Sequence, residues 1–421
     1  MINYSLLFTV DKSMSEQLAK LRESCFKCHG DILRCHPPRC PMRTKTFALN
    51  TIRHEYKDKT TFEGENPPSF FVGSTHYPNV SISPMISLAD LSFSGIIDEP
   101  DQWKTNYSIP DVVNFRTHLI RTKGRRVDAR QSEQLSDRLL EKSRELVLST
   151  DPVYSHFSLD KPLRYDMKFN QYTQPIGPSG KILNFESDTP KIDHKVDYYT
   201  SDNDLLAKEG ITSLFDYGLS VTRINRILSA GMLGVKGQRK LVPTRWSITA
   251  TDDNVGKFLI NEIKDYPTID DYRLFESFYL DNHFLTLLLP KRWAFEFLEC
   301  WNDVISGDYE LFEGRHNYAS NSAGGYYAAR IAILEYLQSI KRQAEVLCWR
   351  YVGDDYYIPL GVWQVRENVR SGMKNFVSFD NVNSAFKTMA TKLQLPFEQW
   401  KHKSFLLNMK KRQTDLFSFI K

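Results

Sequence analysis

Four of the six cysteines in this 421-residue chain lie close together, in the spacing Cys-x2-Cys-x6-Cys-x4-Cys. Two thiolates separated by two residues can bind one metal ion from a tight turn, and a second pair a short loop later can complete a tetrahedron. A site closed by four ligands is structural, because catalytic zinc keeps one position open for water. The spacing therefore predicts a structural zinc site, with His29 and His36 beside it as alternative ligands, at Cys25, Cys28, Cys35 and Cys40.

Two other uses of these cysteines have less in their favour. A pair of disulfides would require an oxidising compartment, and the N-terminus has no basic segment before Leu6–Val10 that would indicate export. A redox Cys-x-x-Cys would not require a second pair nearby. The longest apolar run, Phe284–Pro290, is far shorter than the ~18 residues of a membrane span. We therefore expect a cytoplasmic protein without a membrane segment.

The last nine residues form a second motif, QTDLFSFIK. Gln413, Leu416, Phe419 and Ile420 have the spacing of a PIP box, the segment that binds sliding clamps. One turn of tight helix would place the three apolar residues on one side as a plug, and the Gln413 amide could enter a small polar pocket. Short segments bind through a few buried anchors of this kind. A terminal helix or strand packed on the core is the alternative.

Positive charge is concentrated in two short stretches, although the net charge is only +4. Arg116–Arg130 holds six basic residues and one acid, and Lys401–Arg412 holds five basic residues and no acid. Such local clusters suit contact with a polyanion. The candidate DNA-binding residues are Arg121, Lys123, Arg125 and Arg126, around the turn expected at Gly124. An ordinary solvated surface is the alternative.

Several polar residues in the second half stand beside aromatic and Gly-rich segments. Gly324 and Gly325 precede a predicted helix, whose N-terminal amides could hold a phosphate, and arginine suits phosphate through two parallel hydrogen bonds. The candidate phosphate pocket therefore comprises Arg245, Arg315, Gly324, Gly325 and Arg366. A buried network of salt bridges is the alternative.

The elements that must position these residues are clearest in the C-terminal half. His283–Leu289 and Val346–Val352 are predicted as buried strands, and Gly324–Ile340 as a buried helix that is apolar over most of its surface. Trp293–Val304 is predicted as a helix. Val235–Asp253 is predicted as a basic loop and a β-branched strand, on which Asp252 and Asp253 would point to opposite sides and so form no metal-binding pair.

In the N-terminal half, the predicted helices are Ser13–Arg22, Ile109–Ile120, Ser132–Leu148 and Leu205–Leu228. Asn66–Val80 mixes Pro, Gly and aromatic residues, which is typical of turns that join short strands. Residues 151–200 are predicted as a long irregular connection.

These elements predict a mixed α/β (α+β) core with an N-terminal zinc-binding module and a flexible C-terminal tail. We expect the zinc module in residues 1–45, the core in 46–400 with a division near 150–200, and the basic tail with its PIP motif in 401–421. The apolar fraction of 41% is sufficient for a substantial core.

The cysteine cluster and four further segments resemble the Nre family of archaeal DNA-repair proteins, of the NreA type, over essentially the whole chain. The segments are FFVGSTHYPNVSISPM, VPTRWSITATDD, GRHNYASNSAGGYYAARIAILEYL and PLGVWQVRENVR. The resemblance implies a four-cysteine zinc finger, a clamp-binding motif from Gln413 to Ile420, and repair of DNA damage coupled to the sliding clamp PCNA. His36, where a glycine is common, and Ile420 depart from the family pattern.

The resemblance does not specify a reaction, and two classes of function stay open. One is a non-enzymatic protein that binds DNA and docks on PCNA. The other is a DNA-processing enzyme, a nuclease or nucleotide-handling enzyme. Its active site would lie in the central polar cluster, which comprises Arg245, Asp252, Asp253, Arg315, His316 and Arg366.

The zinc site gives the first prediction. Metal analysis of the purified protein should find about one zinc ion per chain, because four thiolates complete a tetrahedral shell. The double substitution Cys28→Ser, Cys35→Ser should lose the metal. A double variant that kept its zinc would show that other groups bind it.

Overall fold

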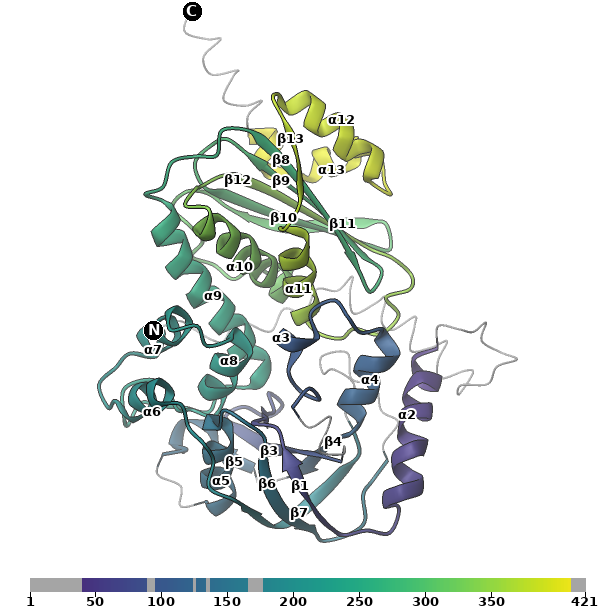
Figure 1. The fold of residues 1–421 in the computed structure, drawn as a ribbon, viewed down its shortest axis with the longest axis vertical. Coiled ribbons are helices and arrows are strands. Elements are labelled where there is room, and N and C mark those ends of the chain that lie inside the picture. The colour runs from purple at the N-terminus through teal and green to yellow at the C-terminus, as the bar shows by residue number, and fades with distance from the viewer. Residues whose placement is uncertain (1–39, 89–94, 124–125, 134–136, 166–176, 410–421) are drawn as a thin grey trace, which may run out of the picture. The chain divides into compact units, whose positions relative to one another are not determined.

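The computed structural model describes residues 40–88, 95–123, 126–133, 137–165 and 177–409. The chain forms two compact units, each built on its own β-sheet (Figure 1). The N-terminal unit comprises residues 40–255 with 359–361, and the C-terminal unit comprises 256–358 and 362–409 of the described chain. The chain passes from one unit to the other within helix α9, Thr244–Ile263, whereas the described residues between 150 and 200 belong to the N-terminal unit.

The N-terminal unit contains a seven-stranded sheet in the order β1-β6-β7-β4-β3-β2, with β5 paired to β3. Most pairs are antiparallel, but β4 and β7 run parallel. The strands are β1 Thr61–Asn66, β2 Phe70–Val72, β3 Asn79–Ser87, β4 Leu119–Lys123, β5 Arg126–Asp128, β6 Val153–Leu159 and β7 Ser179–Ser187. Strand β7 therefore joins the end of the sheet that holds β6 to the end that holds β4.

Helices of this unit begin where side chains cap the first free amides. Ser108 and Asp111 form a reciprocal capping box at α4, and Asp137, Asp193 and Ser220 cap α5, α6 and α8. The helices are α2 Pro41–Tyr56, α3 Pro100–Trp103, α4 Ile109–Thr117, the 3₁₀ turn η2 Ala129–Gln131, α5 Arg138–Leu148, α6 His194–Ser201, α7 Ala207–Asp216 and α8 Val221–Ser229.

One face of the sheet carries the hydrophobic core of this unit. Ile120 on β4, Phe157 on β6 and Phe185 on β7 are buried there, together with Ile52 from α2 and Leu146 from α5. The side chains of β6 alternate strictly between buried and more exposed positions, so the other face of this strand is solvated, as is common in antiparallel sheets.

Within this unit, a buried ionic network links helices α4 and α8 to the segment just before α3. Asp98 accepts hydrogen bonds from Ser69, Arg116 and Arg226, and Arg226 also donates to Glu99. Burial raises the pKa of Glu99, and Arg226 opposes that shift. Removing one partner of a buried pair would leave the other charge uncompensated, which is strongly destabilising.

The C-terminal unit is built on a six-stranded sheet in the order β11-β10-β12-β9-β8-β13, in which β10 and β12 run parallel. Its strands are β8 Tyr272–Tyr279, β9 Asn282–Leu289, β10 Ala294–Trp301, β11 Val304–Glu310, β12 Glu345–Val352 and β13 Phe376–Phe379. Its helices, besides the end of α9, are α10 Ala323–Ser339, α11 Trp363–Gly372, α12 Val382–Lys392 and α13 Phe397–Lys403.

Helices cover both faces of this sheet, with α10 and α11 on one side and α12 and α13 on the other (Figure 1). Tyr326 of α10 packs edge-on against Phe295 of β10, with ring centroids 5.0 Å apart. On the other side Trp400 of α13 stacks on Trp349 of β12, with ring centroids 5.3 Å apart. The central strands are therefore almost continuously apolar, as expected for strands buried on both faces.

The strongest sequence patterns are confirmed. The mixed α/β class holds, β9 and β12 match the two predicted strands, and α10 matches the predicted buried helix. The stretch Asn66–Val80, predicted as turns that join short strands, contains β2 and the turns that connect it to β1 and β3. In the part of the chain that the structure describes, no helix is both long enough and apolar enough for a membrane crossing. The predicted helix Ser13–Arg22 lies outside the described residues.

The predicted helix Trp293–Val304 is wrong, because most of this segment is strand β10. Phe297 lies beside Gly325 of α10, whereas Leu298 and Cys300 belong to the core on the opposite face. A segment buried on both sides has no polar alternation, so periodicity cannot separate a strand from a buried helix. The predicted strand before Asp252 and Asp253 is also wrong, because both aspartates lie on helix α9.

The irregular connection predicted for 151–200 is wrong, because this stretch contains β6, β7 and α6. The helix predicted over 205–228 is two helices, α7 and α8, separated by Gly218 at φ +98°. The helix predicted from Ser132 begins only at Arg138, after the Asp137 cap. The helix predicted to reach Ile120 ends at Thr117, and Ile120 lies on β4.

The segment after α13 is bound to the sheet by a buried carboxylate. Glu296 on β10 accepts hydrogen bonds from Ser404 Oγ at 3.0 Å and from the Leu406 amide at 2.8 Å. Leu406 is fully buried, and Phe405 stacks on Tyr309 with ring centroids 3.6 Å apart. Burial raises the pKa of Glu296 to about 7, although the hydrogen bonds from Leu406 and Ser404 oppose this shift.

This carboxylate gives a pH-dependent prediction. The native carboxyl holds its proton up to about pH 7, whereas the ordinary pKa is 4.5. The native state therefore binds more protons than the unfolded state between these values, so stability falls as pH rises from about 4.5 to 7 and then stays low. The full shift corresponds to roughly 3 kcal/mol at most. Glu296→Gln should remove this loss of stability. The melting temperature of the variant should therefore rise relative to that of the wild type as the pH increases from 5 to 8.

Glu313→Gln is the matched control, because Glu313 is exposed. It should follow the wild-type melting temperature at every pH. A melting-temperature difference between Glu296→Gln and the wild type that did not change with pH would contradict a titrating Glu296.

Candidate nucleic-acid interface

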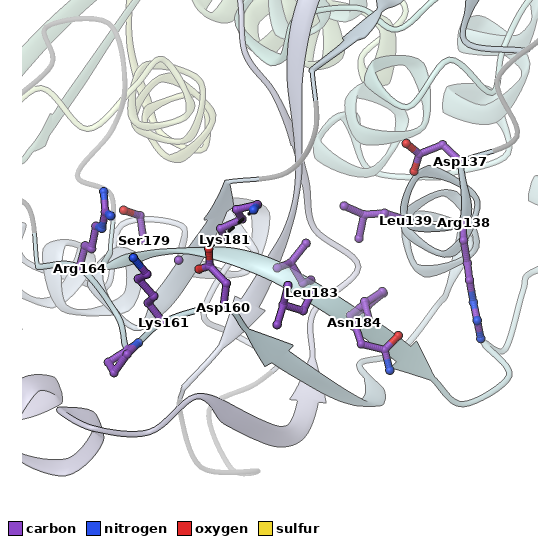
Figure 2. Close-up of a pocket in the computed structure, with 14 residues that line it drawn as sticks. Asp137, Arg138, Leu139, Asp160, Lys161, Arg164, Ser179, Lys181, Leu183 and Asn184 are labelled. Atoms are coloured by element: carbon purple, nitrogen blue, oxygen red, sulfur yellow. Dashed lines mark ion pairs between the residues drawn. The ribbon is translucent and has the colours of Figure 1, made fainter.

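A pocket of about 620 Å³ lies in the N-terminal unit, between the start of α5 and strand β7. The turn that follows β6 closes one end of it. Figure 2 shows its polar and apolar side chains in separate places along β7. The lining residues are Asp137, Arg138, Leu139, Asp160, Lys161, Pro162, Arg164, Ser179, Gly180, Lys181, Ile182, Leu183, Asn184 and Phe185.

Three cations lie together at one end of the pocket. Lys161, Arg164 and Lys181 lie at the same end of the pocket as Asp160 (Figure 2), and the Lys181 Nζ lies 3.7 Å from the Asp160 carboxylate. Within the described chain neither Lys161 nor Arg164 has an ion pair, and both are exposed. Three positive charges against one negative charge make this end electropositive.

Backbone hydrogen bonds fix these cations to the sheet. The Arg164 amide donates to the Ser179 carbonyl at 2.7 Å, and the Ser179 amide donates back at 2.9 Å. The Asp160 amide donates to the Lys181 carbonyl at 3.0 Å. Because the turn is bound to β7 at both of its ends, the three cations are presented from an ordered backbone.

The middle of the pocket is apolar. The β6–β7 register passes from Ser158–Asn184 to Leu159–Ile182, so Leu183 is an extra residue without a partner on β6. Such a bulge redirects a side chain locally, and the Leu183 side chain is 65% exposed. Leu139 of α5 also lines the pocket, on the side opposite β7 (Figure 2).

The far end of the pocket is charged but internally paired. Asp137 accepts the Leu140 amide at 3.1 Å as the cap of α5, and Arg138 lies 2.6 Å from Glu186. Asn184, on β7, is exposed and lies beyond Leu183 from the cationic end (Figure 2).

The predicted basic stretch lies beside this pocket in the sheet. Strand β4 pairs with β7 so that Arg121 is opposite Ser179 and Lys123 is opposite Lys181. The Arg121 guanidinium carbon lies 4.3 Å from the centroid of the Phe71 ring, and partial burial lowers its pKa. Arg126 begins β5 and is exposed. Of Lys123 only the backbone is described, and Arg125 lies outside the described residues.

The residues of the predicted phosphate pocket do not all belong to one unit. Arg245 lies on α9 in the N-terminal unit, whereas the others belong to the C-terminal unit. Arg315 donates to the carbonyls of Tyr309, Asn317 and Tyr318 and to the Asp308 carboxylate. It therefore organises the loop before α10.

The backbone amides just before helix α10 are bound by a carboxylate of the same unit. Asp308 accepts hydrogen bonds from the amides of Asn321 and Ser322 at 3.0 and 2.9 Å. A Cβ at Gly324 would lie 2.8 Å from Val362 Cγ1, so close packing requires this glycine.

The two remaining members of the predicted pocket also contact their own unit. A Cβ at Gly325 would lie 3.5 Å from the Phe297 ring. The buried Arg366 lies 3.9 Å from Glu367. These contacts have structural roles, and the phosphate pocket stays a prediction.

Of the four predicted zinc ligands, only Cys40 is described. It is buried, forms no disulfide with the other described cysteines, and stands at the N-cap position of α2 without a capping hydrogen bond from its side chain. Cys25, Cys28 and Cys35 lie outside the described residues. No cluster of three or more His, Cys, Asp or Glu side chains with metal-binding geometry occurs among the residues that are described.

The other two cysteines have a different environment. Burial raises the pKa of Cys300 to about 11 and that of Cys348 to about 12, so both thiols stay protonated in the core. The predicted PIP motif, Gln413 with Leu416, Phe419 and Ile420, lies outside the described residues.

Sequence patterns alone missed Lys161, Arg164 and Lys181. The alternation of Val153, Ser155, Phe157 and Leu159 with more exposed residues was the available signal for β6. A strand at that position would have placed the following turn, and its cations, at the edge of a sheet.

The fold places the chain among mixed α/β proteins made of two units that each have their own sheet. Residues 34–304 match the family description "Archaeal Nre, N-terminal", and residues 310–419 match "Archaeal Nre, C-terminal". The chain belongs to the archaeal Nre family, as its sequence motifs predicted.

Three curated relatives match this chain over nearly their whole lengths. The DNA repair protein NreB of Archaeoglobus fulgidus is 34% identical over 94% of this chain and 100% of its own. The DNA repair protein NreA of the same organism is 36% identical over 86% of this chain and 92% of its own. The DNA repair protein NreA of Haloferax volcanii is 33% identical over 88% of this chain and 92% of its own. No solved structure matches the chain.

Proposed function

We propose that this protein acts in DNA repair by binding DNA at the basic surface of its N-terminal unit. The observation that carries the proposal is the β4–β7 register, which brings Arg121 and Lys123 of the basic stretch beside the strand that carries Lys181, next to Lys161 and Arg164. Cations from separate parts of the chain meet on one sheet, which suits a phosphate backbone. The relatives are named DNA repair proteins.

Contact of this kind is electrostatic and discriminates weakly between DNA sequences. The cations stand on strands and a turn, and none of them lies on a helix of the length that enters a major groove. Phosphate contacts fix the position of a protein on DNA but carry no sequence information directly. Binding should therefore weaken steeply as salt concentration rises.

The proposal has two further parts. A structural zinc ion bound by Cys25, Cys28, Cys35 and Cys40 would tie the segment before α2 to the start of that helix. The C-terminal PIP motif would dock on the sliding clamp PCNA and deliver the protein to DNA that is being copied or repaired. The motif follows Lys410, Lys411 and Arg412, which would speed encounter with an acidic clamp surface.

The DNA-binding surface is tested by charge reversal. The triple substitution Lys161→Glu, Arg164→Glu, Lys181→Glu should weaken DNA binding about tenfold or more at low salt, because it replaces three phosphate-binding cations with anions. Loss of three phosphate contacts should also reduce the slope of log affinity against log salt by about 2–3. Fluorescence anisotropy with labelled DNA measures both quantities.

The matched control carries the same charge change at exposed lysines elsewhere in the unit, Lys57, Lys208 and Lys236. Its affinity for DNA should fall by much less than that of the test variant. Equal losses in the two triple variants would mean that overall charge, and not this surface, determines binding.

The tail is tested by truncation. Deleting residues 413–421 should abolish PCNA binding while melting temperature and zinc content stay at wild-type values. Burial of Leu416 and Phe419 contributes roughly 1.5–3 kcal/mol each before ordering costs, so the intact protein should bind PCNA with a Kd near the micromolar range. Isothermal titration calorimetry measures the affinity.

Point variants show which residues of the motif contribute to PCNA binding. Phe419→Ala should reproduce the loss of PCNA binding, and Ser418→Ala should bind as the wild type does. A truncated protein with a lowered melting temperature would instead identify the tail as a packed part of the fold.

A further inference from the structure

We propose that the pocket between α5 and β7 takes one unpaired nucleotide of single-stranded DNA. This inference rests on the proposed DNA-binding function and adds the form of DNA that is bound. It has three grounds, which are the size of the pocket, the separation of its charged and apolar parts, and the order of these parts along β7.

The size of the pocket fits a nucleotide. Its volume of about 620 Å³ lies within the range of roughly 300–1,000 Å³ that is usual for small-ligand sites. The bases of a duplex are stacked and paired inside the helix. A base can enter a concave site only from a single strand or after it has left the stack.

The apolar middle distinguishes a nucleotide site from a simple phosphate surface. Contact with the outside of a duplex requires cations and hydrogen-bond donors but no apolar floor. Here Leu183 is 65% exposed between the cations and Asn184, and it lines the pocket at the β-bulge. The flat face of a base would cover this side chain, as a base that has left the stack packs against aromatic or apolar side chains in its pocket.

The chemical groups follow one another in the order of a nucleotide. Lys181, with Lys161 and Arg164, stands where a phosphate would bind, and Leu183 lies two residues further along β7. Two residues of a strand span about 6–7 Å, which one nucleotide bridges from its phosphate to its base. Asn184 comes next, and its amide can both donate to and accept from a base edge.

The test compares DNA forms and variants of the full-length protein by fluorescence anisotropy. The probes are a short labelled single strand of mixed sequence and the blunt duplex of the same sequence. The wild type should bind the single strand about tenfold more tightly than the duplex. Leu183→Ser should weaken single-strand binding about fivefold to tenfold and leave duplex binding unchanged. Leu206→Ser, at another exposed leucine of this unit, is the control and should change neither.

The outcomes separate this inference from the proposed function. If the charge-reversed triple variant loses DNA but Leu183→Ser binds both forms as the wild type does, DNA contact stands and the nucleotide pocket is wrong. If Leu183→Ser weakens both forms equally, or if the wild type prefers the duplex, the inference is also overturned. If neither variant changes the affinity, DNA binds elsewhere and both proposals fail. Equal melting temperatures of the variants establish that each is folded.

Discussion

The pairing of strand β7 with two different neighbours is the constraint on which the candidate site depends. On one side β7 runs antiparallel to β6 and holds the turn that follows β6 through the Arg164–Ser179 backbone hydrogen bonds. On the other side it runs parallel to β4, which carries Arg121. Parallel neighbours require a crossover connection, so these cations are distant in sequence. Only the sheet brings them together.

The same strand also gives the pocket its apolar middle. A regular β7 would pair each residue with one on β6, but the bulge leaves Leu183 without a partner. Leu183 is 65% exposed, so it contributes little to the core of this unit. Cations at one end of the pocket and an exposed apolar side chain in its middle suit a nucleotide better than a phosphate alone.

The sequence predicted those parts of the fold in which one pattern dominates. Strand β9 and helix α10 are apolar over most of their lengths, and their lengths distinguish them. Strand β10 has a similar composition, but helices cover both of its faces, so its apolar pattern is not specific to a strand. Strand β7 was missed because Lys181, Leu183 and Asn184 are all exposed, and the bulge interrupts the alternation that would identify a strand.

Short motifs whose interpretation depends on spacing, such as the cysteine cluster and the proposed PIP motif, can be recognised in the sequence directly and stay predictions. The candidate DNA site cannot, because its cations are separated by up to sixty residues and meet only through strand pairing.

Hydrogen–deuterium exchange with and without single-stranded DNA tests the central claim most directly, because it reports on each segment of the intact protein. One shared surface predicts that DNA slows exchange together in peptides from 119–128, 160–165 and 179–185. Protection of the 119–128 peptides without the other two, or protection confined to a different part of the chain, would contradict a DNA surface organised by strand β7.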